Sequence, residues 1–128
     1  SVEEMSDGAL VVTIPLQTTS EANAREWRGR SNRTRIARDM VSRTLGKELR
    51  KLVPFAEAYH RGEIVRLTFT RLGGYKLDQM ANLGSALKQT EDAVCTMLGA
   101  NDGASNWKAT AEQEPGGLIG VRIRFELG

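Results

Sequence analysis

Three aspartates and one lysine in the second half of the chain are the residues best suited to chemistry. Asp78 lies before a predicted helix, Lys88 and Asp92 lie within it, and Asp102 follows in the loop 99–103. Hard cations such as Mg²⁺ bind oxygen ligands, commonly one or two carboxylates together with waters and substrate phosphate. The three aspartates are therefore candidate metal ligands, because a loop that follows a helix can fold beside another carboxylate. For each aspartate in a loop, the alternative is an ordinary cap or turn residue.

The helix that carries Lys88 and Asp92 is predicted over residues 80–98, with Gly99 as the residue just beyond its end. One side is apolar and consists of Leu83, Leu87, Val94, Met97 and Leu98. The opposite side holds Ala81, Ser85, Lys88 and Asp92. Because Lys88 and Asp92 are four residues apart, their side chains are expected to meet. An exposed ion pair without a chemical role is the alternative to a functional one.

A basic segment spans residues 25–51. Its ten cations are Arg25, Arg28, Arg30, Arg33, Arg35, Arg38, Arg43, Lys47, Arg50 and Lys51, against the three acids Glu26, Asp39 and Glu48. The segment therefore carries +7, and since the whole chain carries +2, the remainder sums to −5. This separation predicts a surface for nucleic-acid phosphates and a different, acidic surface elsewhere. A solvated helix face is the alternative for the basic segment.

The totals suit one domain of 128 residues, which we take as residues 1–128 with a flexible tail over 1–8. Cys95 is the single cysteine, so an internal disulfide and a cysteine-based zinc site are excluded. The first eight residues are acidic and polar, unlike a signal peptide, and no apolar run approaches ~18 residues. We expect a cytoplasmic protein that is encoded by a bacterium or a phage. It is expected neither to bind a membrane nor to use an organic cofactor.

The hydrophobic pattern predicts an α+β fold, a single mixed sheet with two main helices in the order β-α-β-α-β-β. Strands are expected at 9–14, 64–70, 106–111 and 118–127, and the last two are expected to form a hairpin around the turn 114–117. A helix begins near Arg25 and ends at Pro54, with the apolar stripe Ile36, Met40, Val41, Leu45, Leu49 and Leu52. His60 is expected at the surface. Trp27 and Trp107 are expected in the core, with base stacking on nucleic acid as the alternative.

Several motifs in the second half resemble the RusA-type Holliday-junction resolvases, particularly the phage and prophage members. They are Tyr75-Lys76-Leu77-Asp78, Asn82-Leu83-Gly84-Ser85-Ala86-Leu87-Lys88, Glu91-Asp92-Ala93-Val94 and Leu98-Gly99-Ala100-Asn101-Asp102-Gly103. The family typically shows Leu-Asp-x-Asp-Asn-Leu, Ala-Leu-Lys, Arg-Asp and Leu-Gly-Val-Asp-Asp-Gly in this order. Trp107, the stretch 120–124 and the early basic stretch 23–30 are also similar to the family, and the resemblance covers residues 9–127.

The resemblance implies a homodimer that binds four-way DNA junctions and nicks two strands symmetrically in DNA recombination and repair. It implies Mg²⁺ or Mn²⁺ held by Asp78 and Asp102, with Asp92 either a third ligand or the group that orients Lys88. Lys88 would neutralise the scissile phosphate or the leaving oxygen. The implied DNA-binding residues are Asn23, Arg25, Arg28, Arg30, Arg33, Arg35, Arg38 and Lys76.

The chain departs from the family pattern at two carboxylates. Ala81 stands where an aspartate should precede Asn82, and Asn101 replaces the first aspartate of the loop pair. Losing a carboxylate removes a full charge beside a divalent ion. One alternative to a junction nuclease is therefore a weak or inactive homologue that binds branched DNA. Another is a small α+β protein that binds a protein partner through its helix.

Overall fold

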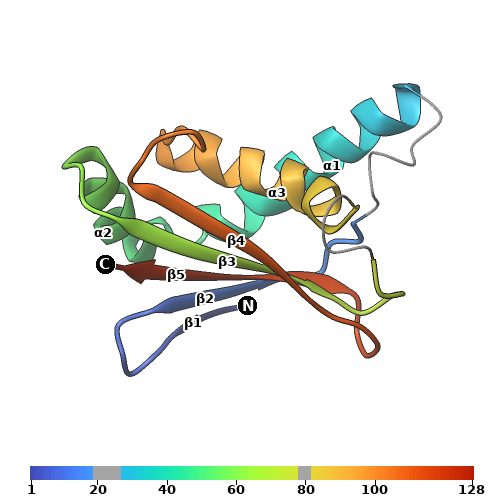
Figure 1. The fold of residues 1–128 in the computed structure, drawn as a ribbon, viewed down its shortest axis with the longest axis horizontal. Helices are drawn as coiled ribbons and strands as arrows, with labels where there is room; N and C mark the ends of the chain where they lie inside the picture. The colour runs from blue at the N-terminus through green and yellow to red at the C-terminus, as the bar shows by residue number, and fades with distance from the viewer. Residues whose placement is uncertain (19–26, 78–81) are drawn as a thin grey trace.

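A computed structural model describes residues 1–18, 27–77 and 82–128, and only the backbone of residues 27–31, 33, 82 and 85. Five strands form one mixed sheet in the order β1-β2-β5-β3-β4. The strands are β1 Val2–Glu4, β2 Leu10–Ile14, β3 Val65–Leu72, β4 Trp107–Glu114 and β5 Gly120–Leu127, and the helices are α1 Trp27–Gly46, α2 Leu49–His60 and α3 Asn82–Leu98. The helices lie along one face of the sheet (Figure 1). The predicted α+β class with a single mixed sheet is confirmed.

The first residues form a strand, so the prediction of a flexible tail over residues 1–8 is wrong for residues 2–4. Val2 pairs with Val12 and Glu4 with Leu10 in an antiparallel register. The backbone N–H of Thr13 donates a further hydrogen bond to the carbonyl of Ser1 at 2.8 Å. Three residues are too short for a clear alternating pattern, and the ladder with β2 decides the conformation.

The predicted hairpin between the last two strands is also wrong, because β3 lies between β4 and β5. β3 pairs in parallel with β4, from Val65 opposite Trp107 to Leu72 opposite Glu114. On its other side β3 pairs antiparallel with β5. A parallel pair requires a crossover connection, and α3 supplies it. The Pro-Gly-Gly turn therefore carries the chain across the end of β3 rather than joining two neighbouring strands.

The basic segment forms two helices, so Pro54 does not end a helix as predicted. α1 ends at Gly46, and α2 begins at Leu49 and runs through Pro54. Leu52, Phe55 and Ala58 are buried on α2, and the Phe55 ring lies 5.5 Å from that of Phe125 on β5. Packing of this apolar face against the sheet outweighs the hydrogen bond that a proline removes.

The break between α1 and α2 interrupts the predicted apolar stripe. Val41, Leu45 and Leu52 are buried as expected, but Ile36 is 45% exposed and Leu49 is 53% exposed. Leu49 is the first residue of a new helix, so the spacing of the first helix does not apply to it. The apolar residues therefore lie on two separate helices and do not form one continuous stripe.

The predicted faces of α3 are confirmed where the side chains are described. Leu83, Leu87, Val94 and Leu98 are buried, whereas Lys88 and Asp92 are exposed. Met97 is partly buried, and Trp107 is buried in the core as predicted. Gly99, with φ +65°, lies just past the helix end as expected. The bonds from Ala100 N to Cys95 O (2.9 Å) and from Gly99 N to Thr96 O (3.4 Å) complete a Schellman motif.

Candidate functional site

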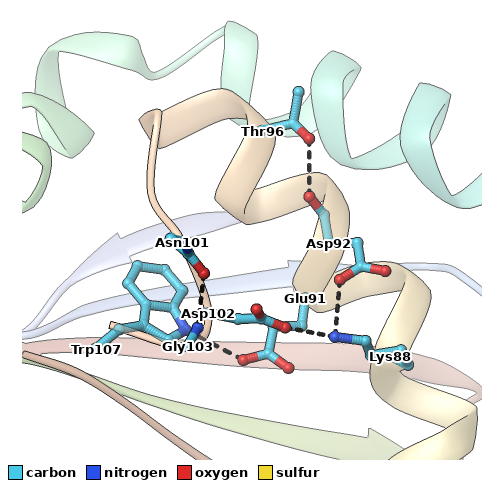
Figure 2. A network of polar contacts seen from close by, with 8 residues as sticks. All are labelled: Lys88, Glu91, Asp92, Thr96, Asn101, Asp102, Gly103 and Trp107. Carbon is cyan, nitrogen blue, oxygen red and sulfur yellow. Dashed lines mark hydrogen bonds and ion pairs between the residues drawn. The ribbon is translucent and has the colours of Figure 1, made fainter. Parts of the chain in front are cut away.

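Lys88 forms ion pairs with both Asp92 and Asp102 (Figure 2). Its Nζ lies 3.1 Å from Asp92 Oδ1, one helical turn further along α3, which confirms the predicted pair. The second pair joins Lys88 Nζ to Asp102 Oδ2 in the loop after the helix. The loop therefore folds back along α3, and two of the three candidate aspartates share one ammonium group.

The shared ion pairs shift the protonation of these groups. The hydrogen bond to Asp102, and then that to Asp92, raises the pKa of Lys88 above its ordinary value of 10.5. The hydrogen bond and the charge of Lys88 hold the pKa of Asp102 below its ordinary value of 3.8. Both pKa shifts favour the charged forms of Lys88 and Asp102 at neutral pH.

The C-terminal turn of α2 anchors the loop that carries Asp102. The backbone N–H of Asn101 donates to the Tyr59 hydroxyl at 2.9 Å. Within the loop, the side-chain oxygen of Asn101 accepts from Gly103 N at 2.8 Å, and its carbonyl accepts from Ala104 N at 3.0 Å. Asn101, which replaces an expected carboxylate, shapes the turn that presents Asp102.

A second set of contacts fixes both flanks of this loop to α2. His60 Nε2 lies 3.0 Å from the carbonyl of Leu98 at the end of α3. Asn106 Nδ2 donates to the carbonyls of Tyr59 at 2.9 Å and of Glu63 at 3.0 Å. His60 is exposed, as predicted, but it also satisfies a carbonyl at the end of a helix.

Trp107 ties the start of β4 to α3. Its indole N–H donates to Glu91 Oε2 at 3.1 Å (Figure 2), and its ring meets that of Tyr59 edge-on at 5.9 Å. Sequence reasoning missed the positioning roles of Tyr59, His60, Asn106 and Glu91. Only the contact between Trp107 and Glu91 had a signal in the sequence, because a buried tryptophan requires an acceptor for its N–H.

The described residues do not assemble a site for a divalent metal ion. Within residues 1–18, 27–77 and 82–128, no group of three histidine, cysteine or acidic side chains could hold such an ion. The carboxylates of Asp92 and Asp102 are engaged by Lys88, and the side-chain oxygen of Asn101 is engaged by Gly103. Asp78 lies outside the described residues. The expected set of Mg²⁺ ligands is therefore not brought together in the part of the chain that is described.

The segment just before Asp78 is held by side chains of neighbouring strands. Arg71 on β3 donates to the carbonyl of Tyr75 at 2.7 Å. The amide of Gln113 on β4 accepts from Leu77 N and donates to Leu77 O, both at 2.8 Å. Lys76, a candidate DNA contact, is exposed between these two anchors. Tyr75 and Leu77 are therefore fixed to β3 and β4 just before Asp78.

A cationic surface lies on α1, the turn after it and the start of α2. We call Arg35, Arg38, Arg43, Lys47 and Arg50 the cationic face, and all five are exposed. Ala37 and Val41 on the same helix are buried. Of the other predicted DNA contacts, Asn23 and Arg25 lie outside the described residues. Arg28, Arg30 and Arg33 are placed in α1 by their backbone alone.

The cationic face surrounds one exposed acid, Asp39, which lies four residues from both Arg35 and Arg43 on α1. In the described ranges, none of its five side chains takes part in an ion pair. Arg35 donates to the neutral side-chain oxygen of Asn32 at 2.8 Å. By contrast, Lys51 pairs with Glu48, and Arg61 pairs with Glu57 and Glu63. Five exposed cations that form no ion pair with a described acid therefore lie within residues 35–50.

Comparison of the chain with family models, curated proteins and solved structures finds no match. We therefore infer the function from the residues and their geometry. Among the described helices, none is both long and apolar enough to cross a membrane.

Proposed function

We propose that this protein binds branched DNA, in particular four-way junctions, through the cationic face. The observation that carries the proposal is a set of exposed guanidinium and ammonium groups without acidic partners among the described residues. Arg35, Arg38 and Arg43 are exposed on α1, so they can reach phosphates without disturbing the core. Phosphate contacts of this kind supply affinity and orientation, and junction shape supplies selectivity.

The choice of a branched substrate comes from the ordered motifs that resemble junction resolvases. Their implied partner is a second copy of the chain, because a homodimer with twofold symmetry matches the symmetry of a junction. The setting that we infer is DNA recombination and repair in the cytoplasm of a bacterium or of a phage-infected cell. Light scattering of the purified protein, with and without a junction, tests the dimer.

Paired nicking of the junction by hydrolysis is the second candidate function. The observation that favours it is the convergence of Lys88, Asp92 and Asp102 from α3 and the following loop. Binding remains the better supported function, since the described carboxylates already have a cation in Lys88 and do not form a metal site. Nicking with Mg²⁺ or Mn²⁺ would need Asp78 as well.

The binding proposal is tested by the salt dependence of junction affinity. We expect the affinity of the native protein to fall steeply with salt. The double substitution Arg35→Gln and Arg38→Gln should flatten the slope of log K against log salt by ~0.9 per lost phosphate contact. Arg61→Gln is the matched control, because Arg61 is already paired with two glutamates. A junction affinity that does not depend on salt, or an equal effect of Arg61→Gln, would contradict the proposal.

The nicking candidate is tested with an end-labelled junction in Mg²⁺ or Mn²⁺. If the protein is a nuclease, Asp102→Asn and Asp78→Asn should each abolish symmetric nicks while leaving junction binding intact. If the native protein does not cleave the junction, nicking is rejected and binding is the only proposed function that stands. Cleavage that neither substitution changes would show that the acidic site has been placed on the wrong residues.

A further inference from the structure

Lys88 occupies the position of a cation between two carboxylates from different parts of the fold. Asp92 approaches it from the next turn of α3, and Asp102 approaches it from the loop beyond the helix. Figure 2 shows the ammonium group between the two side chains, each joined to it by a dashed line. Two acids separated along the chain thus have one shared counter-charge that belongs to the protein.

The contacts around this triad hold its members in place. Lys88 and Asp92 lie on the same helix, one turn apart. Asp102 follows Asn101, whose backbone is tied to the Tyr59 hydroxyl and whose side chain closes the turn at Gly103. The loop therefore presents Asp102 to Lys88 without requiring the ion pair itself to order the chain, and the triad is preorganised.

Other oxygen atoms near the triad are also engaged. Glu91 accepts a hydrogen bond from the indole of Trp107, and the side-chain oxygen of Asn101 accepts one from Gly103. A divalent ion that approached Asp92 and Asp102 would therefore meet one ammonium group and two carboxylates that are already paired. It would have to displace Lys88 or remain beside a like charge, and both options oppose binding.

We propose that Lys88 is a built-in counter-cation that closes the Asp92–Asp102 pair to divalent metal ions. Two effects then weaken metal binding. One is the absence of carboxylates at Ala81 and Asn101, and the other is the positive charge that Lys88 supplies. Loss of the ammonium group should open the pair to a metal ion. This inference concerns the free protein and does not depend on the DNA-binding proposal.

The test is a titration of the free protein with Mn²⁺, followed by the electron paramagnetic resonance signal of the unbound ion. The variants are Lys88→Met, which keeps most of the unbranched side chain but removes the charge, and Lys88→Arg, which keeps the charge. Lys108→Met is the matched control, since Lys108 is exposed on β4 and has no ion pair among the described residues. Adding Asp102→Asn to each protein identifies the Mn²⁺ that binds at the pair.

We expect Lys88→Met to bind Mn²⁺ about tenfold or more tightly than the native protein, as expected for the removal of one nearby charge at a partly exposed site. The gain should disappear when Asp102→Asn is added, and Lys88→Arg and Lys108→Met should behave as the native protein does. Equal Mn²⁺ affinity of the native and Lys88→Met proteins would overturn the proposal. So would a gain that Asp102→Asn leaves unchanged. Circular dichroism of each variant verifies that it is folded.

Discussion

The Tyr59 hydroxyl accepts a hydrogen bond from the backbone N–H of Asn101 at 2.9 Å, across 42 residues of sequence. It joins the last turn of α2 to the loop that carries Asp102. His60 contacts the carbonyl of Leu98 before the loop, and Asn106 after the loop donates to the carbonyl of Tyr59, so α2 supports the loop on both flanks. The position of Asp102 therefore depends on a helix distant in sequence.

Tyr59→Phe should loosen this loop without disturbing the core. The substitution keeps the edge-on contact with Trp107 and removes the oxygen that accepts from Asn101. We expect the Asn101 amide to exchange its hydrogen about two- to tenfold faster, as the loss of one hydrogen bond predicts. Amide exchange followed by nuclear magnetic resonance measures the effect.

The control for this change is Tyr75→Phe, which removes the only other tyrosine hydroxyl from a residue that is 91% exposed. Exchange at Asn101 should be unchanged in this variant. Equal exchange at Asn101 in the native protein and in Tyr59→Phe would show that the hydroxyl does not hold the loop.

Gly73→Ala should be more destabilising than Gly62→Ala. Both glycines have positive φ, +73° and +86°, so alanine is strained at either position by ~1–2 kcal/mol. At Gly62 an added Cβ meets open space, but at Gly73 it would lie 2.8 Å from the carbonyl oxygen of Leu118, in the connection that crosses β3. We expect a further loss of ~1–3 kcal/mol at Gly73 from this overpacking. Urea unfolding of the two variants gives the difference, and equal losses would refute the close crossing.

Thr90→Val should stabilise the protein. Thr90 is 1% exposed, and its hydroxyl has no hydrogen-bond partner in the described part of the chain. Valine has nearly the same shape and removes the buried hydroxyl, so we expect a gain of ~1 kcal/mol in the free energy of unfolding. Thr96→Val on the same helix should give no gain, because the Thr96 hydroxyl donates to the Asp92 carbonyl at 3.0 Å. A loss of stability in Thr90→Val would show that its hydroxyl is satisfied.

The ion pair between Lys88 and Asp102 makes its contribution to stability dependent on pH. Because the pKa of Asp102 is lowered in the folded protein, the pair stabilises above the ordinary value of 3.8 and the effect is lost as the pH falls through the lowered value. Because the pKa of Lys88 is raised, the effect is complete below 10.5 and is lost as the pH rises through the raised value. The difference in Tm between the native protein and Asp102→Asn should therefore be present at pH 7 and disappear in strong acid. A difference that does not vary with pH would contradict the pair.

The sequence was sufficient for features that depend on local periodicity. The α+β class, the two faces of α3, the pairing of Lys88 with Asp92 and the helix end at Gly99 are all confirmed. Each follows from spacing within one element or from one residue's backbone freedom. The burial of Trp107 also follows from the large apolar surface of its side chain.

Long-range relations were not predictable in the same way. Nothing near Pro115 indicates that β3 would lie between β4 and β5, because strand order depends on the crossover through α3. Nothing near Tyr59 indicates its contact with Asn101. The helix end predicted at Pro54 is wrong because the packing of Phe55 and its neighbours offsets the backbone hydrogen bond that proline removes.

The most direct test of the central claim is a competition between branched and linear DNA for the free protein. A labelled four-way junction is bound at physiological salt without divalent metal, and unlabelled junction or linear duplex of the same arm sequence is added. We predict that the junction competes at a concentration at least about tenfold lower than the duplex, counted per base pair. Equal competition by the two DNAs would contradict the claim that this protein recognises branched DNA.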